Sequence, residues 1–346
     1  MHLEELLVSE ETTVMQAMEK LDSSAKKILL VEKDRKLLGT ITDGDIRRWI
    51  LKKGDLNASV NRIMTTSPVT LSMSRSHEAY ELMKLKKIEA IPIVDHENNI
   101  VSISFWNMKK EVISSEKINI PVVIMAGGKG TRLYPYTKIL PKPLIPIGDI
   151  PIVERIINNF KEFGCSEFYM TIHHKKNMIM SYFNEIEKEY ELNYVIEERP
   201  LGTGGSLSLI RNKLKETFFV SNSDTLLQAD YADILKFHRE KKYKMTIVAS
   251  LKEVAIPYGV IKLNDDGDME KIVEKPTYNH LINTGLYLIE PELLHLIPDN
   301  MFYNLPDLIM KCIAGGIKVG VYPVGQNSWL DMGQLEEMKK MLNQFK

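Results

Sequence analysis

The fold of this protein is decided by the stretch Met125-Ala-Gly-Gly-Lys-Gly-Thr-Arg-Leu-Tyr-Pro-Tyr-Thr-Lys-Ile-Leu-Pro-Lys-Pro143. It follows the apolar run 121–125, which is typical of a buried parallel strand. Its glycines allow a sharp turn and a close approach of the backbone to a ligand. No acid lies between residues 126 and 142, and four cations do: Lys129, Arg132, Lys138 and Lys142. A cationic, glycine-rich loop at a strand end predicts a polyphosphate site.

The loop lacks the Gly-Lys-Ser/Thr ending of a P-loop and the third-glycine spacing of the dinucleotide fingerprint. Residues 128–137 and 141–144 instead resemble the signature of the sugar nucleotidyltransferases, Gly-x-Gly-Thr-Arg-Leu-x-Pro-x-Thr followed by Pro-Lys-Pro-Leu. The alternative is a glycine-rich turn with solvated lysines. The resemblance implies that the nucleotide is bound by these residues: Ala126, Gly127, Gly128, Gly130 and Thr131.

Two aspartates are candidate metal ligands. Asp224 follows the predicted strand 217–221, where an open α/β sheet places its ligands. Asp331 lies in a segment, 329–333, that resembles the family's Trp-x-Asp-x-Gly. The resemblance makes both carboxylates ligands of Mg²⁺, a hard cation that prefers oxygen. Taken alone, each aspartate is equally consistent with a turn or a helix cap. The predicted catalytic residues are therefore Arg132, Lys142, Asp224 and Asp331.

The segment 198–205, Glu-Arg-Pro-Leu-Gly-Thr-Gly-Gly, resembles the family's base-recognition segment, in which Gly202 would allow close approach to the nucleoside. Guanine presents two adjacent donors, which a carboxylate accepts, whereas uracil and thymine suit an amide such as Gln. Relatives that use UTP or dTTP tend to have Gln in this region, and this chain has Glu197-Glu198. Glu198 therefore favours GTP. The alternative is that both acids are solvated and the backbone reads the base.

Three downstream motifs resemble the sugar-phosphate half of the family's site: Tyr258-Gly-Val260, Glu274-Lys-Pro276 and Asn283-Thr-Gly285. In the family the glycine lies under the sugar, the acid and the asparagine contact its hydroxyls, and the lysine reaches phosphate. The resemblance implies these sugar-phosphate residues: Gly259, Glu274, Lys275 and Asn283. The pair His173-His174 follows a strand and is interpreted as surface imidazoles, because no partner lies at metal-ligand spacing.

The first 117 residues contain a weak internal repeat in which helix, strand, strand and helix occur twice. This arrangement resembles a tandem pair of CBS domains, most clearly at 39–45. The resemblance implies that Thr42 contacts phosphate and Asp45 the ribose of an adenosine nucleotide; the alternative is that both cap a helix. The second unit lacks this pair. Its equivalents, depending on register, are Ser104 and Asn107, or Phe105 and Met108.

From residue 118 strands and helices alternate, which argues for βαβ units and an open sheet. The predicted class is α/β: a Rossmann-like open mixed sheet, the nucleotide-diphospho-sugar transferase fold, preceded by a tandem CBS (βαββα) module. The predicted domains are CBS repeat 1 at 1–58, CBS repeat 2 at 59–117 and the catalytic domain at 118–346.

The composition limits the partners. The 346 residues are 44% hydrophobic and 26% charged with a net charge of −1, which favours neither nucleic acid nor an anionic membrane. No apolar run reaches the roughly 20 residues of a membrane span. The acidic N-terminus is unlike a signal peptide, and Cys165 and Cys312 have no metal or redox spacing. A cytoplasmic protein is therefore expected.

The resemblance implies nucleotidyl transfer from an NTP, with GTP favoured, to a sugar 1-phosphate, with Mg²⁺ as cofactor. A CBS pair ahead of a short guanylyltransferase-like domain most resembles bacterial enzymes of legionaminic acid synthesis, whose acceptor is glucosamine 1-phosphate. Mannose or heptose 1-phosphate and UTP, dTTP or CTP stay open, as does a non-enzymatic adenylate sensor. CBS modules commonly pair across dimers, so a homodimer is expected.

Overall fold

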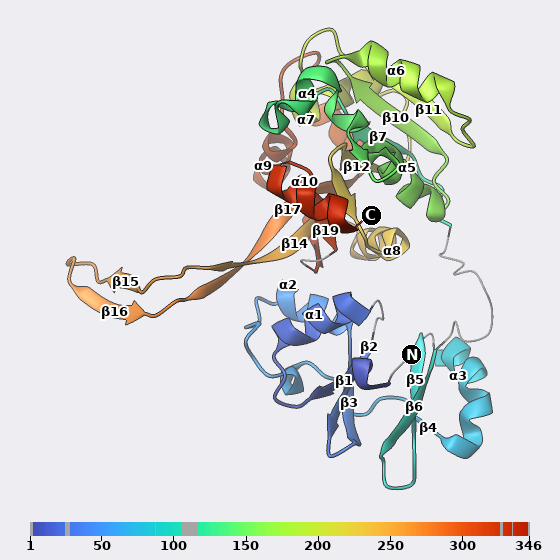
Figure 1. The fold of residues 1–346 in the computed structure, drawn as a ribbon, viewed down its shortest axis with the longest axis vertical. Coiled ribbons are helices and arrows are strands. Elements are labelled where there is room, and N and C mark those ends of the chain that lie inside the picture. The colour runs from blue at the N-terminus through green and yellow to red at the C-terminus, as the bar shows by residue number, and fades with distance from the viewer. Residues whose placement is uncertain are drawn as a thin grey trace. The chain divides into compact units, whose positions relative to one another are not determined.

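The protein is described by a computed structural model that covers residues 3–24, 28–86, 88–105, 117–325, 328–333 and 335–344 (Figure 1). The chain divides into two compact units. The first combines Met1–Ile113, Leu251–His280 and Gly325–Asn327, and the second combines Ser114–Ser250, Leu281–Val324 and Ser328–Lys346. Within the described residues, no helix is long and apolar enough to cross a membrane.

The first unit contains two small sheets with the same pairing pattern, which supports the predicted repeat. In each sheet the first strand runs parallel to the central strand and the third runs antiparallel to it. The elements of the first repeat are β1 (Leu7–Ser9), α1 (Val14–Ser24), β2 (Ile28–Lys33), β3 (Lys36–Thr42) and α2 (Asp43–Leu51). Those of the second are β4 (Leu71–Ser72), α3 (Ala79–Lys86), β5 (Ala90–Val94) and β6 (Ile100–Phe105). The final helix predicted for the second repeat lies outside the described residues.

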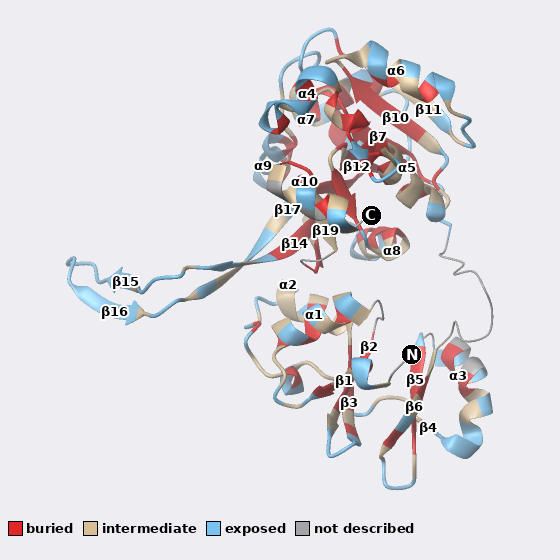
Figure 2. Ribbon diagram, in the orientation of Figure 1, coloured by how far each residue is buried: buried red, intermediate tan, exposed pale blue. Residues whose placement is uncertain are grey.

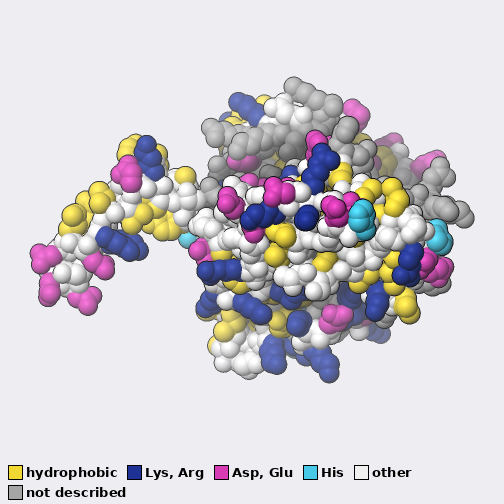
Figure 3. All heavy atoms as spheres, turned by 90° about the horizontal axis from the view of Figure 1, so that it is seen from below, with side chains coloured by type: hydrophobic (Ala, Val, Ile, Leu, Met, Phe, Trp, Pro, Cys, Tyr) yellow, Lys and Arg dark blue, Asp and Glu magenta, His cyan; other side chains and the backbone are white. Residues whose placement is uncertain are grey.

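The first unit also includes an antiparallel hairpin, β15 (Val260–Leu263) and β16 (Met269–Val273). Its turn contains the exposed acids Asp265, Asp266 and Asp268, and Figure 3 shows acidic side chains gathered at one end of this segment. The pairs Ile261–Ile272 and Leu263–Met269 occupy one face, and each of these four side chains is more than half exposed. A two-stranded ribbon with so little burial derives scant stability from its own packing.

The second unit is built on a seven-stranded sheet with the order β11-β10-β7-β12-β17-β14-β18. Neighbours among β11, β10, β7 and β12 are parallel, β17 is antiparallel to β12, and β14 and β18 are parallel. This mixed open sheet confirms the predicted α/β class. The strands are β7 (Val122–Met125), β10 (Glu167–Ile172), β11 (Glu191–Ile196), β12 (Phe218–Asn222), β14 (Met245–Ala255), β17 (Thr277–Ile289) and β18 (Val319–Val324).

Successive residues of the central strands pack into two separate cores, because side chains alternate across a sheet. Val122 and Ile124 belong to one core, and Val123 belongs to the other. Both faces are thus covered, as the buried strands of Figure 2 show. The first core is closed by α5 (Ile152–Glu162), α6 (Lys176–Glu185), α8 (Tyr231–Lys241) and α10 (Leu335–Gln344), and the second by residues 207–214, 293–297 and α9 (Leu305–Ala314).

A buried polar network ties the antiparallel side of the sheet together. His238 of α8 is 1% exposed, and its Nε2 lies 3.1 Å from Oε1 of Glu290. The same carboxylate oxygen accepts a hydrogen bond from Thr217, and Nδ1 of His238 lies 2.8 Å from Oγ1 of Thr246. An ionised carboxylate only accepts, so Nε2 carries the proton and Nδ1 accepts from the Thr246 hydroxyl. Burial, opposed by Glu290, holds the pKa of His238 below its ordinary value of 6.5.

This network predicts a loss of stability in mild acid. Because the folded-state pKa of His238 is depressed, the unfolded chain takes up the proton first as the pH falls. The stabilisation is complete above pH 6.5 and is lost as the pH falls through the folded-state pKa. We expect His238→Gln to reduce the decrease in melting temperature between pH 7.5 and pH 5.5. Thermal unfolding of the wild type, His238→Gln and the exposed control His295→Gln tests this, and parallel curves for all three would contradict it.

Candidate active site

The glycine-rich loop lies at the carboxyl ends of the parallel strands. Residues 126, 173 and 197 directly follow β7, β10 and β11, so the segments that they begin meet at one edge of the sheet. Gly128 faces open space, since a Cβ there would meet nothing within 4 Å. Gly130 has a φ of +66°, and a Cβ there would lie 3.0 Å from the side chains of Thr137 and Lys142. Gly128 thus leaves room for a ligand, whereas Gly130 is required by the packing of the loop itself.

Two contacts fix the shape of this loop. The hydroxyl of Thr137, in α4 (Tyr136–Ile139), donates to the carbonyl of Gly130 at 2.8 Å. Lys175 has a left-handed φ of +52°, and its ammonium donates to the carbonyls of Thr137, Lys138 and Ile139 at 3.2, 2.6 and 2.8 Å. An ammonium has three donors, so it satisfies three carbonyls that the short helix leaves unpaired. Lys175 is a positioning residue that the sequence did not indicate.

The predicted catalytic carboxylates come together through a small antiparallel sheet, β13 (Thr225–Leu227) and β19 (Trp329–Asp331). Thr225 pairs with Asp331, and the amide of Met332 donates to the carbonyl of Asp224 at 2.9 Å. Oδ1 of Asp331 accepts from the amide of Gly333 at 2.7 Å. The structure therefore places two residues from distant parts of the sequence on adjacent strand ends.

Two of the predicted cations lie at the carboxylate pair. Lys142 forms an ion pair with Asp224, and both side chains are largely buried. Burial and the neighbouring Asp224 carboxylate raise the pKa of Asp331, while Lys142 and Arg132 oppose this shift. The other three predicted catalytic residues are thus within electrostatic reach of Asp331. Arg132 and Thr131 are exposed, as expected of side chains that face a ligand.

The carboxylate pair suits a divalent cation in chemistry and charge. The two carboxylates together carry more negative charge than the Lys142 ammonium balances. Their oxygens are also the kind of ligand that Mg²⁺ prefers, together with phosphate oxygens. Within the described ranges, no group of three or more His, Cys, Asp and Glu side chains is placed to hold a metal. The remaining ligands of such an ion would therefore be water and substrate oxygens.

A buried acid precedes the predicted base-recognition segment and differs from the acid that the sequence indicated. Glu198 is exposed, whereas Glu197 is 4% exposed and lies against the glycine loop. A Cβ at Gly127 would lie 2.6 Å from Oε1 of Glu197, and Oε2 accepts from the amide of Leu201 at 3.0 Å. Burial raises the pKa of Glu197. The alternation of buried Val195 and exposed Ile196 continues past β11 and places Glu197 on the buried side, but the sequence itself, with two apolar residues followed by two acids, does not distinguish Glu197 from Glu198.

Gly202 serves the packing of the protein itself. Its φ is +77°, and a Cβ would lie 2.7 Å from the carbonyl of Tyr303. That carbonyl accepts from the amides of Gly204 and Gly205, both at 2.9 Å. The helical turn α7 (Gly202–Gly205) therefore rests directly on the loop before α9. His173 contributes from the neighbouring strand end, where its Nδ1 lies 2.9 Å from the carbonyl of Glu197.

The predicted sugar-phosphate residues fall into two groups. Asn283 in β17 is exposed; its Oδ1 accepts from the amide of Gly285 at 3.0 Å and its Nδ2 donates to Tyr287 at 2.6 Å. The hairpin of the first unit brings the other two motifs together, because a Cβ at Gly259 would lie 3.0 Å from a carboxylate oxygen of Glu274. Lys275 is exposed with a φ of +43°.

The predicted CBS pair forms a helix cap. Thr42 and Asp45 make a reciprocal capping box at the start of α2, and Arg48 also pairs with Asp45. Both β3 and β6 have one extra residue in their pairing with the central strand, between Leu37 and Gly39 in β3 and between Ile100 and Ser102 in β6. Aligning the two strands at these bulges places Phe105 at the position of Thr42. Phenylalanine has no hydroxyl for phosphate, so the register supports the loss of this function in the second repeat. Asn107 and Met108 lie outside the described residues.

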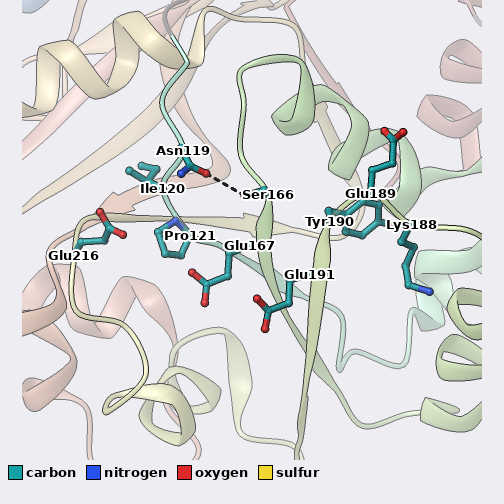
Figure 4. Close-up of a pocket in the computed structure, with 10 residues that line it drawn as sticks. All are labelled: Asn119, Ile120, Pro121, Ser166, Glu167, Lys188, Glu189, Tyr190, Glu191 and Glu216. Atoms are coloured by element: carbon teal, nitrogen blue, oxygen red, sulfur yellow. Dashed lines mark hydrogen bonds between the residues drawn. The ribbon is translucent and has the colours of Figure 1, made fainter.

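A hollow of about 620 Å³ lies at the opposite, amino ends of β7, β10 and β11 (Figure 4). Its charged lining is mostly acidic: Glu167, Glu189, Glu191 and Glu216, with Lys188. Carboxylates repel phosphate, so this hollow suits a nucleotide poorly. The two ends of the sheet therefore differ in charge, and the cationic loop at the carboxyl end is the better nucleotide site.

Comparison with known proteins identifies the families that the chain matches. Residues 121–345 match the nucleotidyl transferase family, and residues 1–52 match the CBS domain. The chain is 32% identical over 222 residues to a probable mannose-1-phosphate guanylyltransferase 1 of Oryza sativa subsp. japonica, covering 61% of each protein. It is also 32% identical over 236 residues to a UTP–glucose-1-phosphate uridylyltransferase of Synechocystis, covering 62% of this chain and 60% of that one. The chain thus spans about three fifths of the length of these relatives.

Solved structures share the fold. HddC from Yersinia pseudotuberculosis superposes with a TM-score of 0.52 at 24% identity, covering 66% of this chain and all of that one. The same protein complexed with GMP-PN gives a TM-score of 0.51. At this identity the similarity shows a shared fold and not shared substrates.

Proposed function

The chain belongs to the nucleotidyl transferase family, and we propose that it couples an NTP with a sugar 1-phosphate to give an NDP-sugar and pyrophosphate. The observation that carries this proposal is the meeting of Asp224 and Asp331 with Arg132 and Lys142 beside the glycine loop. This arrangement offers cations to a triphosphate and paired carboxylates to a metal. It contains no nucleophile–base pair, which agrees with a reaction whose nucleophile is a substrate.

The chemistry is an in-line displacement at phosphorus. An oxygen of the sugar phosphate forms a bond to the α-phosphorus of the NTP, and the bond from that phosphorus to the bridging oxygen of the β-phosphate breaks. Pyrophosphate leaves with the bonding electrons. Because the nucleophile is already an anion near pH 7, positioning and charge neutralisation account for catalysis. Arg132 and Lys142 would neutralise the triphosphate, and Lys275 would hold the sugar phosphate.

A bound Mg²⁺ would be held by Asp224 and Asp331, and it would neutralise charge on the phosphate oxygens. The raised pKa of Asp331, caused by burial and by Asp224, marks a carboxylate pair that a cation would stabilise. The protein's own part is to hold these carboxylates at the strand ends of β13 and β19.

GTP is the proposed nucleotide. A carboxylate beside the glycine loop suits the two adjacent donors of guanine better than the single donor of uracil or thymine. Glu197 has the burial and the position for this role, and Glu198 is its exposed neighbour. UTP, dTTP and CTP are the competing nucleotides, and the relatives above include both a guanylyl- and a uridylyltransferase by name.

Glucosamine 1-phosphate is the proposed acceptor, as in the enzymes of legionaminic acid synthesis that the order of domains resembles. Mannose 1-phosphate and a heptose 1-phosphate are the alternatives. The decisive experiment measures pyrophosphate release with Mg²⁺ for each NTP paired with each sugar 1-phosphate. Turnover confined to GTP and glucosamine 1-phosphate supports the full proposal. Turnover with another pair would support the proposed reaction but contradict the proposed substrates. No turnover with any pair would overturn the proposed reaction.

A nucleotide site in the first CBS repeat is a separate proposal, with AMP as the ligand and a homodimer as the assembly. Asp45→Ala is expected to weaken AMP binding at least about tenfold, because the carboxylate would accept from the ribose hydroxyls, while loss of the cap costs about 1 kcal/mol. Asp307→Ala removes the matching capping-box acid of α9 and is the control. Calorimetric titration with AMP measures both. AMP binding without any turnover would favour the sensor, and equal affinities would exclude Asp45 from the site.

A further inference from the structure

Lys142 contacts one of the two carboxylates that would hold the proposed metal. Its ammonium pairs with Asp224, and the two side chains are only 11% and 15% exposed. Asp331 lies beside Asp224, since Thr225 pairs with Asp331 and the amide of Met332 donates to the carbonyl of Asp224 at 2.9 Å. One ammonium therefore serves as the counter-ion of a carboxylate pair in the free protein.

A divalent cation that binds Asp224 through Oδ2, the oxygen in contact with Lys142, must displace the ammonium, and a cation bound through Oδ1 would be repelled by it. Without another partner, the ammonium would remain in a largely buried position with its hydrogen bonds unmade, which is costly. A triphosphate on the glycine loop offers such a partner. We infer that Lys142 prevents free metal from binding to the carboxylate pair. A bound nucleotide makes the pair available, because its phosphates replace Asp224 as the partner of Lys142. This inference rests on the proposed function and adds an order to it: metal is held firmly only together with nucleotide.

The local backbone favours an exchange by side-chain rotation. Lys142 is flanked by Pro141 and Pro143, both buried, and it opens a short 3₁₀ turn that ends at the buried Leu144. The aliphatic part of the Lys142 side chain lies against Gly130. A Cβ added to Gly130 would lie 3.0 Å from Cβ and 3.4 Å from Cδ of Lys142. The main chain is thus fixed, and the stem rests on the loop that would receive the phosphates. A ligand on that loop is adjacent to the ammonium that it would attract.

The test is a titration of the full chain with Mn²⁺, followed by electron paramagnetic resonance in the absence of nucleotide. We expect Lys142→Met to bind Mn²⁺ at least about tenfold more tightly than the wild type, because the competing ammonium is gone. Lys138→Met is the matched control, since it removes the same charge from an exposed position of the same loop. A non-hydrolysable GTP analogue should tighten Mn²⁺ binding in the wild type more than in Lys142→Met.

Equal or weaker Mn²⁺ binding by Lys142→Met, including no detectable binding by either protein, would overturn the inference. An equal gain in Lys142→Met and Lys138→Met would also overturn it, since the effect would then be one of net charge alone. If Lys142→Met fails to fold, Lys142→Gln provides the same comparison. The readout needs no turnover, so tighter binding by the variant combined with an inactive wild type would reject the proposed function and keep the inference.

Discussion

Asp224→Asn is expected to lower the rate of pyrophosphate release by at least about 10³-fold and to leave the fold intact. Asparagine has the shape of aspartate and still accepts a hydrogen bond from Lys142, but it removes the charge that a metal requires. The contact that joins β13 to β19 uses the carbonyl of Asp224 and is unaffected. Steady-state kinetics with the proposed substrates, together with the melting temperature, measure both parts of the prediction.

Asp299→Asn is the control for this change. Asp299 is 79% exposed and pairs with Arg211, so the same substitution there should leave turnover unchanged. Arg132→Ala should also abolish turnover, because this exposed guanidinium is assigned to the triphosphate. Near-normal turnover in Asp224→Asn or in Arg132→Ala, with the protein folded, would refute the assignment of the site.

Glu197→Gln is expected to lower kcat/KM for GTP by about 10- to 100-fold, with a smaller loss for UTP or dTTP. A glutamine amide presents one acceptor and one donor, so one guanine donor would lose its partner. The variant keeps an oxygen to accept from the amide of Leu201, which preserves the local structure. The measurement is kcat/KM for each nucleotide at one fixed concentration of sugar 1-phosphate.

Glu198→Gln decides between the two neighbouring acids. It makes the same change of charge at an exposed position, so it should leave the ratio of GTP to UTP unchanged if Glu197 reads the base. A loss confined to Glu198→Gln would return the role to the residue that the sequence motif indicated. An unchanged ratio in both variants would show that the backbone reads the base.

The architecture could be predicted because it depends on local and periodic signals. The apolar run before the glycine loop, the alternation of strands and helices and the repeated pattern near the N-terminus all reflect which faces must be buried. The ends of helices are harder to predict from the sequence. Helix α6 begins at Lys176 and ends at Glu185 because Lys175 adopts a left-handed conformation and Ile186 is extended, and no glycine or proline marks either end in the sequence.

The sequence alone predicts which segments would bind phosphate, because glycines and cations at this spacing are typical of phosphate-binding loops. Only the tertiary structure decided how they meet. The pairing that brings Asp331 next to Asp224, the three carbonyls that accept from Lys175 and the burial of Glu197 all depend on chain segments distant in sequence. Such contacts leave no local pattern, because they arise when strand ends gather at one edge of a sheet.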